Sequence, residues 1–405
     1  MSLIFKILKY VFFFIIIISI IIFLFFRTYY QFGGTPDKKS QLNINNSDHY
    51  ITDGFVNIYK IAKFKIDKNK PRSQDPSLKD WFFPPEGKNP SRPLPSIMFN
   101  KDEFKNDKFS WLGHSTVLMN TGGLKIITDP VFNRASPIPI LGKPFPYKNT
   151  TNIEDLPKIN VVILSHDHYD HLDAKAMNKL SNKIDHFIVP LGVKGHLMSW
   201  GIDRTKISEL DWYETKNYQG VDFTLTPAQH FSGRSFTDLN KTLWGSWVIK
   251  SQDLNLFFSG DSGYSDIFKE IGKDYGPFDL AFIECGGYNS NWADVHMFPY
   301  EAVQSSIDLN ANLFIPISWA KFDLSIHTWD EPIIRLTTES KRREVNISTP
   351  MIGEVFDISK PPNDQFFSSL NFPDFTNIIE LNNNFKYLLS TGGYPSQVTN
   401  LLLYS

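Results

Sequence analysis

Residues 161–173, VVILSHDHYDHLD, contain four apolar residues and a serine, followed directly by three histidines and three aspartates. The apolar residues are typical of a buried strand, so the polar cluster stands at a rigid strand end. Imidazoles held this close together repel one another when protonated, and a bound metal ion removes that repulsion by using their lone pairs. The stretch therefore favours a metal site over an exposed polar loop.

The donors in this cluster are imidazole nitrogens and carboxylate oxygens, which suit zinc and the neighbouring first-row metals. Three further donors follow strand-like segments later in the chain, where loops on a rigid sheet bring distant residues to one rim. The candidate metal ligands are His166, His168, Asp170, His171, His230, Asp261 and His327. This set is large enough for two metal ions if one carboxylate bridges them.

Short strand-like segments alternate with helix-like segments from residue 109 onwards. Residues 109–132, FSWLGHSTVLMNTGGLKIITDPVF, have two apolar runs on either side of a Gly-Gly turn, which is typical of a β-hairpin. Further strand-like segments lie at residues 187–190, 221–230, 243–261, 279–287 and 312–319, and helix-like segments lie at 174–181 and 264–271. Since no internal repeat of fixed period is visible, we expect a layered α/β domain rather than a solenoid or propeller.

The charge balance and the cysteine content exclude several classes of protein. With 41 basic and 43 acidic residues the net charge is −2, so the chain has no electrostatic footprint for nucleic acid. Cys285 is the only cysteine, so the chain cannot form an intrachain disulfide. Because Cys285 lies in the apolar segment AFIECGG, we expect it to be a core residue rather than a nucleophile.

The N-terminus carries an apolar run, YVFFFIIIISIIIFLFF at residues 10–26, which is interrupted only by Ser19. A helix of this length reaches roughly 26 Å, and the flanking Lys6 and Lys9 extend it toward the roughly 30 Å of a bilayer core. The segment that follows offers no small-residue cleavage site of a signal peptide. We therefore expect a single-pass N-terminal transmembrane helix in the cell membrane; basic residues on both flanks leave its orientation open.

The order of the donors resembles the metallo-β-lactamase fold superfamily, in which an H-x-H-x-D-H signature precedes a histidine, an aspartate and a last histidine. Several segments are also similar to those of the N-acylphosphatidylethanolamine-hydrolysing phospholipases D and their bacterial relatives, namely WLGHSTVL, TDPVF, LSHDHYDHLD, TPAQHFSGR, SGDSGY and HMFPYEAV. The resemblance covers residues 107–354. It implies an αββα sandwich and a hydrolase that uses two zinc ions, with Mn²⁺ or iron as alternatives.

The resemblance also assigns roles to residues. It implies that one ion is held by His166, His168 and His230, that the other is held by Asp170, His171 and His327, and that Asp261 bridges them. His296 aligns with a histidine near the metal centre, where it protonates a leaving oxygen or contacts a phosphate. Asp170, Asp261 and His296 are therefore the expected catalytic residues.

Residues around the expected metal centre have supporting roles. We expect Asp129 and Asp173 to accept hydrogen bonds from ligand imidazoles, and His114 to fix a neighbouring loop rather than to bind metal. Arg234 either faces an anionic substrate or forms a surface salt bridge.

The function that the resemblance implies is cleavage of N-acyl phosphatidylethanolamine to phosphatidic acid and an N-acylethanolamine. A hydrolase of a small ester or lactone, similar to ascorbate 6-phosphate lactonase, is the main alternative, because the ligands do not define the substrate. The charge balance argues against a nuclease, and the full donor set argues against a non-catalytic binding module. Both a phospholipid and a small molecule thus stay open as substrate, as does the oligomeric state.

Composition and motifs together divide the chain into four parts. We expect a membrane anchor at residues 1–30, a polar, proline-rich tether and covering segment at 31–106, the hydrolase domain at 107–356, and a C-terminal extension of unknown role at 357–405.

Overall fold

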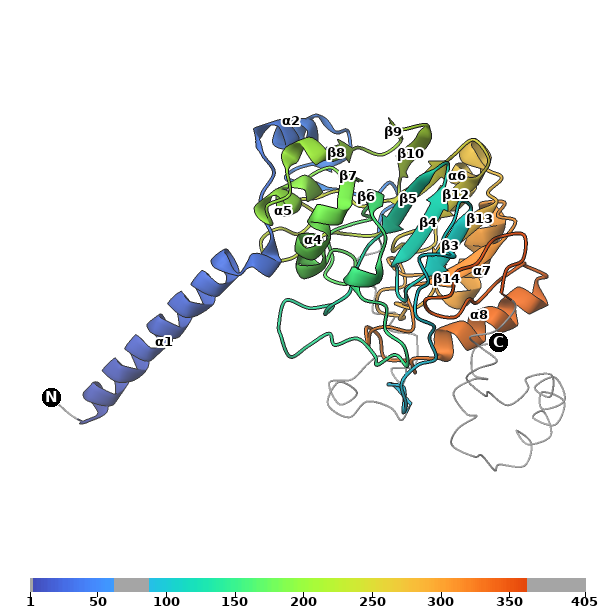
Figure 1. The fold of residues 1–405 in the computed structure, drawn as a ribbon. Coiled ribbons are helices and arrows are strands. Elements are labelled where there is room, and N and C mark those ends of the chain that lie inside the picture. Colours follow the sequence, from blue (N-terminus) through green and yellow to red (C-terminus); the bar gives the residue numbers. More distant parts are fainter. Residues whose placement is uncertain (1–2, 62–86, 363–405) are drawn as a thin grey trace, which may run out of the picture.

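The computed structural model describes residues 3–61 and 87–362 of the chain. Within these residues, two six-stranded sheets pack face to face and helices cover their outer faces (Figure 1). The layers are therefore α, β, β and α, as the resemblance implies. Residues 363–405 of the expected C-terminal extension lie outside the described residues, and the division into four parts stays a prediction.

The first sheet has the strand order β3-β4-β5-β6-β7-β8. Its strands are β3 (Lys108–Trp111), β4 (Val117–Thr121), β5 (Leu124–Thr128), β6 (Ile159–Ile163), β7 (Ile184–Pro190) and β8 (Ile207–Leu210). The pairs from β3 to β5 are antiparallel and those from β5 to β8 are parallel. The crossover from β6 to β7 runs through α4 (Ala174–Leu180), and that from β7 to β8 runs through α5 (Val193–Ser199).

The second sheet has the strand order β14-β13-β12-β11-β10-β9. Its strands are β9 (Thr215–Tyr218), β10 (Val221–Thr226), β11 (Ser246–Lys250), β12 (Asn255–Phe258), β13 (Leu280–Glu284) and β14 (Phe314–Ile317). The pairs from β9 to β12 are antiparallel, whereas β12, β13 and β14 are parallel. Its helices are α6 (Ile267–Tyr275), α7 (Pro299–Asp308) and α8 (Glu331–Arg342).

The predicted hairpin is confirmed as β4 and β5, which pair up to Thr121 and Leu124. The two turn residues, Gly122 and Gly123, have φ angles of 56° and 76°. Such a two-residue hairpin turn requires positive φ at both central positions, which glycine adopts without a steric cost.

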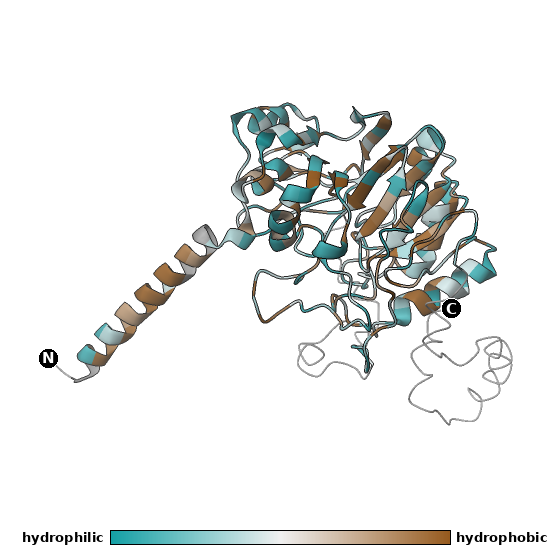
Figure 2. Ribbon diagram, in the orientation of Figure 1, coloured by the Kyte–Doolittle hydropathy of each residue, from teal (hydrophilic) through white to brown (hydrophobic). Residues whose placement is uncertain are grey.

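Hydrophobic residues, brown in Figure 2, recur along the strands. Their buried side chains form two cores. Successive residues of a strand face opposite sides of its sheet, so neighbours on β5 enter different cores. Ile126 packs in the core between the sheets, while Ile127 packs with Met177 and Leu180 of α4 in the outer core. This burial on both faces makes the sandwich a rigid support for the loops at its edge.

Residues 29–61 pack on the domain through short elements. These are η1 (Tyr30–Phe32), α2 (Lys38–Asn46), β1 (Tyr50–Ile51) and β2 (Gly54–Phe55); the other 3-10 helices are η3 (Ile153–Asp155), η4 (Ser181–Lys183) and η5 (Arg204–Lys206). Ile44 and Phe55 are each only 1% exposed and belong to the core between the sheets. The segment thus contributes to the packed domain.

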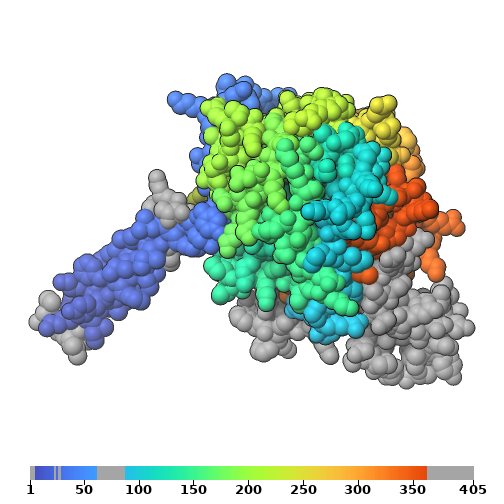
Figure 3. Space-filling model, in the orientation of Figure 1, coloured from blue at the N-terminus to red at the C-terminus, as the bar shows by residue number. Residues whose placement is uncertain are grey.

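The predicted membrane anchor is wrong. The N-terminal residues form α1 (Leu3–Thr28), which projects away from the sandwich (Figures 1 and 3). Among the described helices, none is both long and apolar enough to cross a bilayer. The apolar run at residues 10–26 contains Ser19 and lies between Lys9 and Arg27, so charged side chains limit its length at both ends. The predicted single-pass location in the cell membrane is corrected with it.

Candidate metal centre

The candidate ligands lie just beyond the carboxyl ends of strands from both sheets. The signature loop, residues 165–173, follows β6, while His230 follows β10 and Asp261 follows β12. A side chain at Gly260 would bring its Cβ within 2.4 Å of Ser165 Cβ, so glycine at this position lets the two loops approach. The donors therefore meet at one edge of the sandwich.

The first group of donors consists of three histidines. His166 Nε2 lies 2.9 Å from His168 Nδ1, which lies 3.3 Å from His230 Nε2. Zinc with bonds of about 2.0–2.1 Å to imidazoles in tetrahedral geometry separates its ligand nitrogens by roughly 3.3 Å. The distances in this group are close to that separation, so the three imidazoles fit one divalent metal ion.

Neighbouring groups orient these imidazoles. His230 Nδ1 lies 2.9 Å from the carbonyl oxygen of Val295 and donates to it, which leaves Nε2 free to face the site. Asn57 holds the backbone of the same residue, because its side chain donates to His230 O at 2.7 Å and accepts from His230 N at 3.0 Å. Burial lowers the pKa of His166 and His230 well below its ordinary value, so both rings are neutral and offer a lone pair.

The second group consists of Asp170, His171 and Asp261. His171 Nε2 lies 3.0 Å from Asp261 Oδ2 and 3.5 Å from Asp170 Oδ2. On the other side of the ring, Nδ1 lies 2.7 Å from Asp129 Oδ2, so Asp129 accepts a ligand N–H as predicted. Burial opposes ionisation of Asp261, but the neighbouring His171 holds its pKa well below the ordinary value. Ionised carboxylates thus stand beside the imidazole.

Asp173 has a different role from the one predicted. Its Oδ1 accepts from the backbone N–H groups of Lys175 and Ala176 and caps α4, and its Oδ2 accepts from Phe132 and Asn133. The residue therefore closes the signature loop onto a helix and a neighbouring segment.

His296 lies at the side of this group, next to a carboxylate that the sequence analysis missed. Its Nδ1 lies 3.3 Å from Glu284 Oε1 and 4.0 Å from Asp261 Oδ2. Glu284 is fully buried at the end of β13 and accepts from Met297 N at 3.0 Å. Burial would lower the pKa of His296, but the Glu284 carboxylate raises it to about 9. Glu284 could have been identified from the sequence, because it is a charged residue in the apolar segment AFIECGG and a buried carboxylate needs a partner.

The structure brings together six of the predicted ligands but leaves His327 apart. The groups of His, Asp and Glu donors that lie within 4.8 Å of one another, in the described parts of the chain, include His114 and His296 but not His327. The two ring nitrogens of His327 face the carbonyl oxygens of Thr328 and Gly286 at 2.8 and 2.9 Å. Its assignment as a ligand stays a prediction.

The residues of this edge fit a divalent metal. His171 Nε2 is buried and forms no hydrogen bond with any described residue, although two carboxylates lie within 3.5 Å. The neutral imidazoles of His166 and His230 and the ionised carboxylate of Asp261 are in the protonation states that a metal ion needs in its ligands. The group supplies nitrogen and oxygen donors only, which suit zinc, manganese and iron.

Arg234 holds the signature loop from inside the protein. It is 3% exposed, and its guanidinium donates to the carbonyl oxygens of Asp167 and Leu172, at the two ends of the loop. It also donates to Gln31 O at 2.7 Å. Both predicted roles, substrate contact and surface salt bridge, are wrong because the side chain is enclosed by the chain itself.

Replacing Arg234 with lysine is expected to lower the free energy of unfolding by about 2–4 kcal/mol, because one ammonium group cannot reach three buried carbonyls. Urea unfolding measures the change. Arg204→Lys is the matched control, since its side chain is 60% exposed and lies 3.6 Å from Asp37. Equal changes in the two variants would contradict the role of Arg234.

Comparisons with known proteins agree with this architecture. A family model described as the beta-lactamase superfamily domain matches residues 125–319. The crystal structure of CmlA, a diiron beta-hydroxylase from Streptomyces venezuelae, shares the fold with a TM-score of 0.50 and 16% identity, over 62% of this chain and 54% of that one. The fold and the donor groups define a metal-dependent hydrolase of the metallo-β-lactamase fold.

Two relatives with similar sequences show the family to which the chain belongs. An uncharacterized protein of Mycobacterium tuberculosis is 35% identical over 324 residues, which cover 78% of this chain and 86% of that protein. N-acyl-phosphatidylethanolamine-hydrolyzing phospholipase D 1 of Caenorhabditis elegans is 35% identical over 292 residues, which cover 66% of this chain and 81% of that protein. The chain therefore belongs to the metallo-β-lactamase superfamily, in the family of the N-acyl-phosphatidylethanolamine-hydrolyzing phospholipases D.

Proposed function

We propose that this protein hydrolyses the phosphodiester of an N-acyl phosphatidylethanolamine and releases phosphatidic acid and an N-acylethanolamine. The observation that carries the proposal is the 35% identity to the phospholipase D of Caenorhabditis elegans over 81% of that protein. The buried donor groups support it, because a phosphodiester is a stable bond whose hydrolysis by water gains most from divalent ions at the reacting phosphorus.

The centre of this proposal is binuclear. His166, His168 and His230 would hold the first ion, a group that contains Asp170 and His171 would hold the second, and Asp261 would contribute to both. We assign zinc to both positions, with manganese or iron as alternatives that the same donors accept. Bound divalent ions lower the pKa of water and neutralise the negative charge that builds on phosphorus.

The chain itself orients the donors and supplies a proton. Asp129 and the Val295 carbonyl accept the N–H groups of His171 and His230, which keeps each ring in one orientation. His296 carries the proton for the departing ethanolamine oxygen. Its place 3.3 Å from Glu284 Oε1 and 4.0 Å from Asp261 Oδ2 supports this role, because two carboxylates stabilise its protonated ring.

The test uses the purified full chain with detergent-dispersed N-acyl phosphatidylethanolamine in heavy-oxygen water. Mass spectrometry is expected to find both products, with the heavy oxygen in phosphatidic acid, because water attacks phosphorus. Heavy oxygen in the N-acylethanolamine would instead show attack on carbon and refute the mechanism. A generic phosphodiester, small esters and lactones are assayed in parallel; turnover of lactones without turnover of the lipid would replace the proposed substrate.

A further inference from the structure

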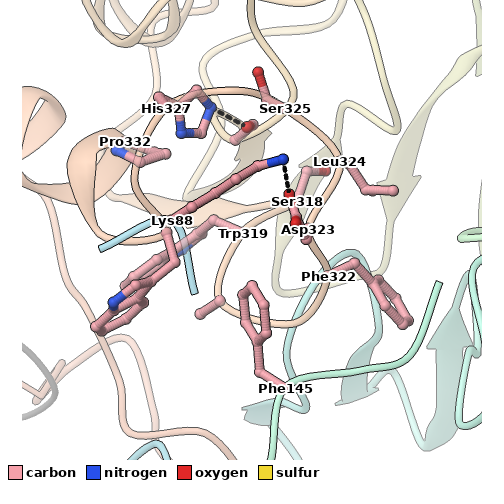
Figure 4. Close-up of a pocket in the computed structure, with 13 residues that line it drawn as sticks. Lys88, Phe145, Ser318, Trp319, Phe322, Asp323, Leu324, Ser325, His327 and Pro332 are labelled. Atoms are coloured by element: carbon pink, nitrogen blue, oxygen red, sulfur yellow. Dashed lines mark hydrogen bonds and ion pairs between the residues drawn. The ribbon is translucent and has the colours of Figure 1, made fainter. Parts of the chain in front are cut away.

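The group around Asp170 and His171 lacks the imidazole that the sequence assigned to it. His327 lines the pocket drawn in Figure 4 together with Ser318, and its ring stacks on Tyr288 with 4.4 Å between centroids. Because both ring nitrogens of His327 face carbonyl oxygens, neither has a lone pair directed at the metal centre. The second metal position therefore needs another donor.

The residue that β14 does present to the centre is Ser318. Its hydroxyl donates to Asp261 Oδ1 at 3.1 Å and lies 2.7 Å from Ser115 Oγ. A neutral hydroxyl is a weaker zinc ligand than imidazole, and this one already binds the central carboxylate. Ser318 thus orients Asp261 rather than replacing His327.

His114 lies beside Asp170 and His171. It lies in the turn between β3 and β4, is 2% exposed, and brings Nε2 to 3.0 Å from Asp170 Oδ2. Its ring also packs edge-to-face against that of His171, with centroids 5.1 Å apart. His114, Asp170 and His171 form one of the groups whose donor atoms all lie within 4.8 Å.

The backbone of His114 is held in a strained conformation that aims this ring. Its φ angle of 53° is in the left-handed region, which costs a bulky residue about 1–3 kcal/mol. The backbone N–H donates to Trp319 O at 3.1 Å, while its carbonyl accepts from Ser318 N at 3.1 Å and from Trp111 Nε1 at 2.7 Å. Such over-determined strain is typical of residues that are held for a function.

We propose that His114, Asp170, His171 and Asp261 form the second metal position, with His114 as the imidazole ligand in place of His327. The buried His171 Nε2, which forms no hydrogen bond within the described residues, faces the same point. This inference rests on the binuclear centre of the proposed function but not on its lipid substrate.

The experiment compares His114→Asn with His327→Asn in the full chain. Asparagine tolerates positive φ, so His114→Asn keeps the turn while it withdraws the imidazole. Metal content is measured by elemental analysis after dialysis against buffered zinc, and the second binding step is measured by titration with Co²⁺ and visible absorption. The first ion, on His166, His168 and His230, reports whether each variant is folded.

We expect two ions in the natural chain and in His327→Asn, and one ion in His114→Asn, whose second step weakens by more than the ~10–100-fold expected of a residue that only orients a ligand. Two ions in His114→Asn at unchanged affinity, or fewer than two in the natural chain, would overturn the inference. Loss of the second ion in His327→Asn alone would also overturn it. If the metal contents are as expected but the lipid is not cleaved, the result contradicts the proposed substrate and leaves the assignment of His114 intact.

Discussion

Replacing Asp261 with asparagine is expected to reduce phosphodiester hydrolysis by about 10³-fold or more and to remove metal from the centre. This exceeds the ~10–100-fold effect of residues that only orient a ligand. Asp261 is 4% exposed and lies 3.0 Å from His171 Nε2, and it belongs to two of the donor groups. Asparagine keeps the shape of the side chain and an oxygen that accepts from Ser318. The loss of activity and metal therefore measures the contribution of the negative charge.

Two control variants test whether the effect is specific. Asp129→Asn alters a carboxylate that accepts from His171 and from Ser165 without facing the donor groups, so its activity is expected to fall by about 10–100-fold with metal retained. Asp253→Asn, exposed in the turn between β11 and β12, is expected to change neither quantity. The measurements are kcat/KM and metal content per chain. Equal losses in Asp261→Asn and Asp129→Asn, with metal retained in both, would contradict the central place of Asp261.

Removing the metal with a chelator is expected to abolish hydrolysis and to destabilise the fold. An ion present at about 1,000 times its Kd contributes about 4 kcal/mol to the free energy of unfolding, which corresponds to a fall in Tm of roughly 5–10 °C. The physical reason is that the ion joins donors from separate loops, among them His166, His230 and Asp261, and binds the folded chain rather than the unfolded one.

Calorimetry and product assays check this prediction. Chelator saturated with zinc beforehand is the control, because it leaves the metal in place and is expected to leave both Tm and activity unchanged. Adding zinc, manganese or iron back separately identifies the metal that restores the rate. Full activity in a chain shown to be free of metal would refute the metal-dependent mechanism.

The signature loop is an example of a feature that could be predicted from local sequence. His166, His168, Asp170 and His171 are close in sequence and follow a buried strand, so their proximity is enforced by a few covalent bonds. The β4–β5 hairpin was predictable for the same reason, since two glycines define its turn. Such features depend on neighbours in the chain.

The surroundings of Asp170 and His171 could not be predicted from local sequence. Ser115 and Ser318 are 203 positions apart in the chain, yet their hydroxyls lie 2.7 Å from each other. This contact, and the bonds that aim His114, exist only after the two sheets have packed. The order of donors along the chain was therefore compatible with His327 as the last ligand, although the packed loops direct its ring at two carbonyl oxygens.

The contacts of the N-terminal segment were also not predictable from its composition. Its polar, proline-rich composition predicted a tether and covering segment, but it did not indicate that Asn57 forms two hydrogen bonds with His230, 173 positions later. The apolar run before it predicted an anchor, and no described helix meets the requirements of a span. Composition indicates how often the residues of a segment are exposed to solvent. Which hydrogen-bond partner each polar group finds depends on how the segment packs on the rest of the protein.

The chemistry of the metal site, the layered α/β class and the family were thus encoded in short motifs, because strand ends and ligand spacing are local. Which histidine lies beside Asp170 and His171, which carboxylate lies beside His296, and which side chains hold the signature loop were decided by the tertiary structure. The physical reason is that these contacts join segments far apart in the chain, whose distance is set by the burial of two sheets against each other.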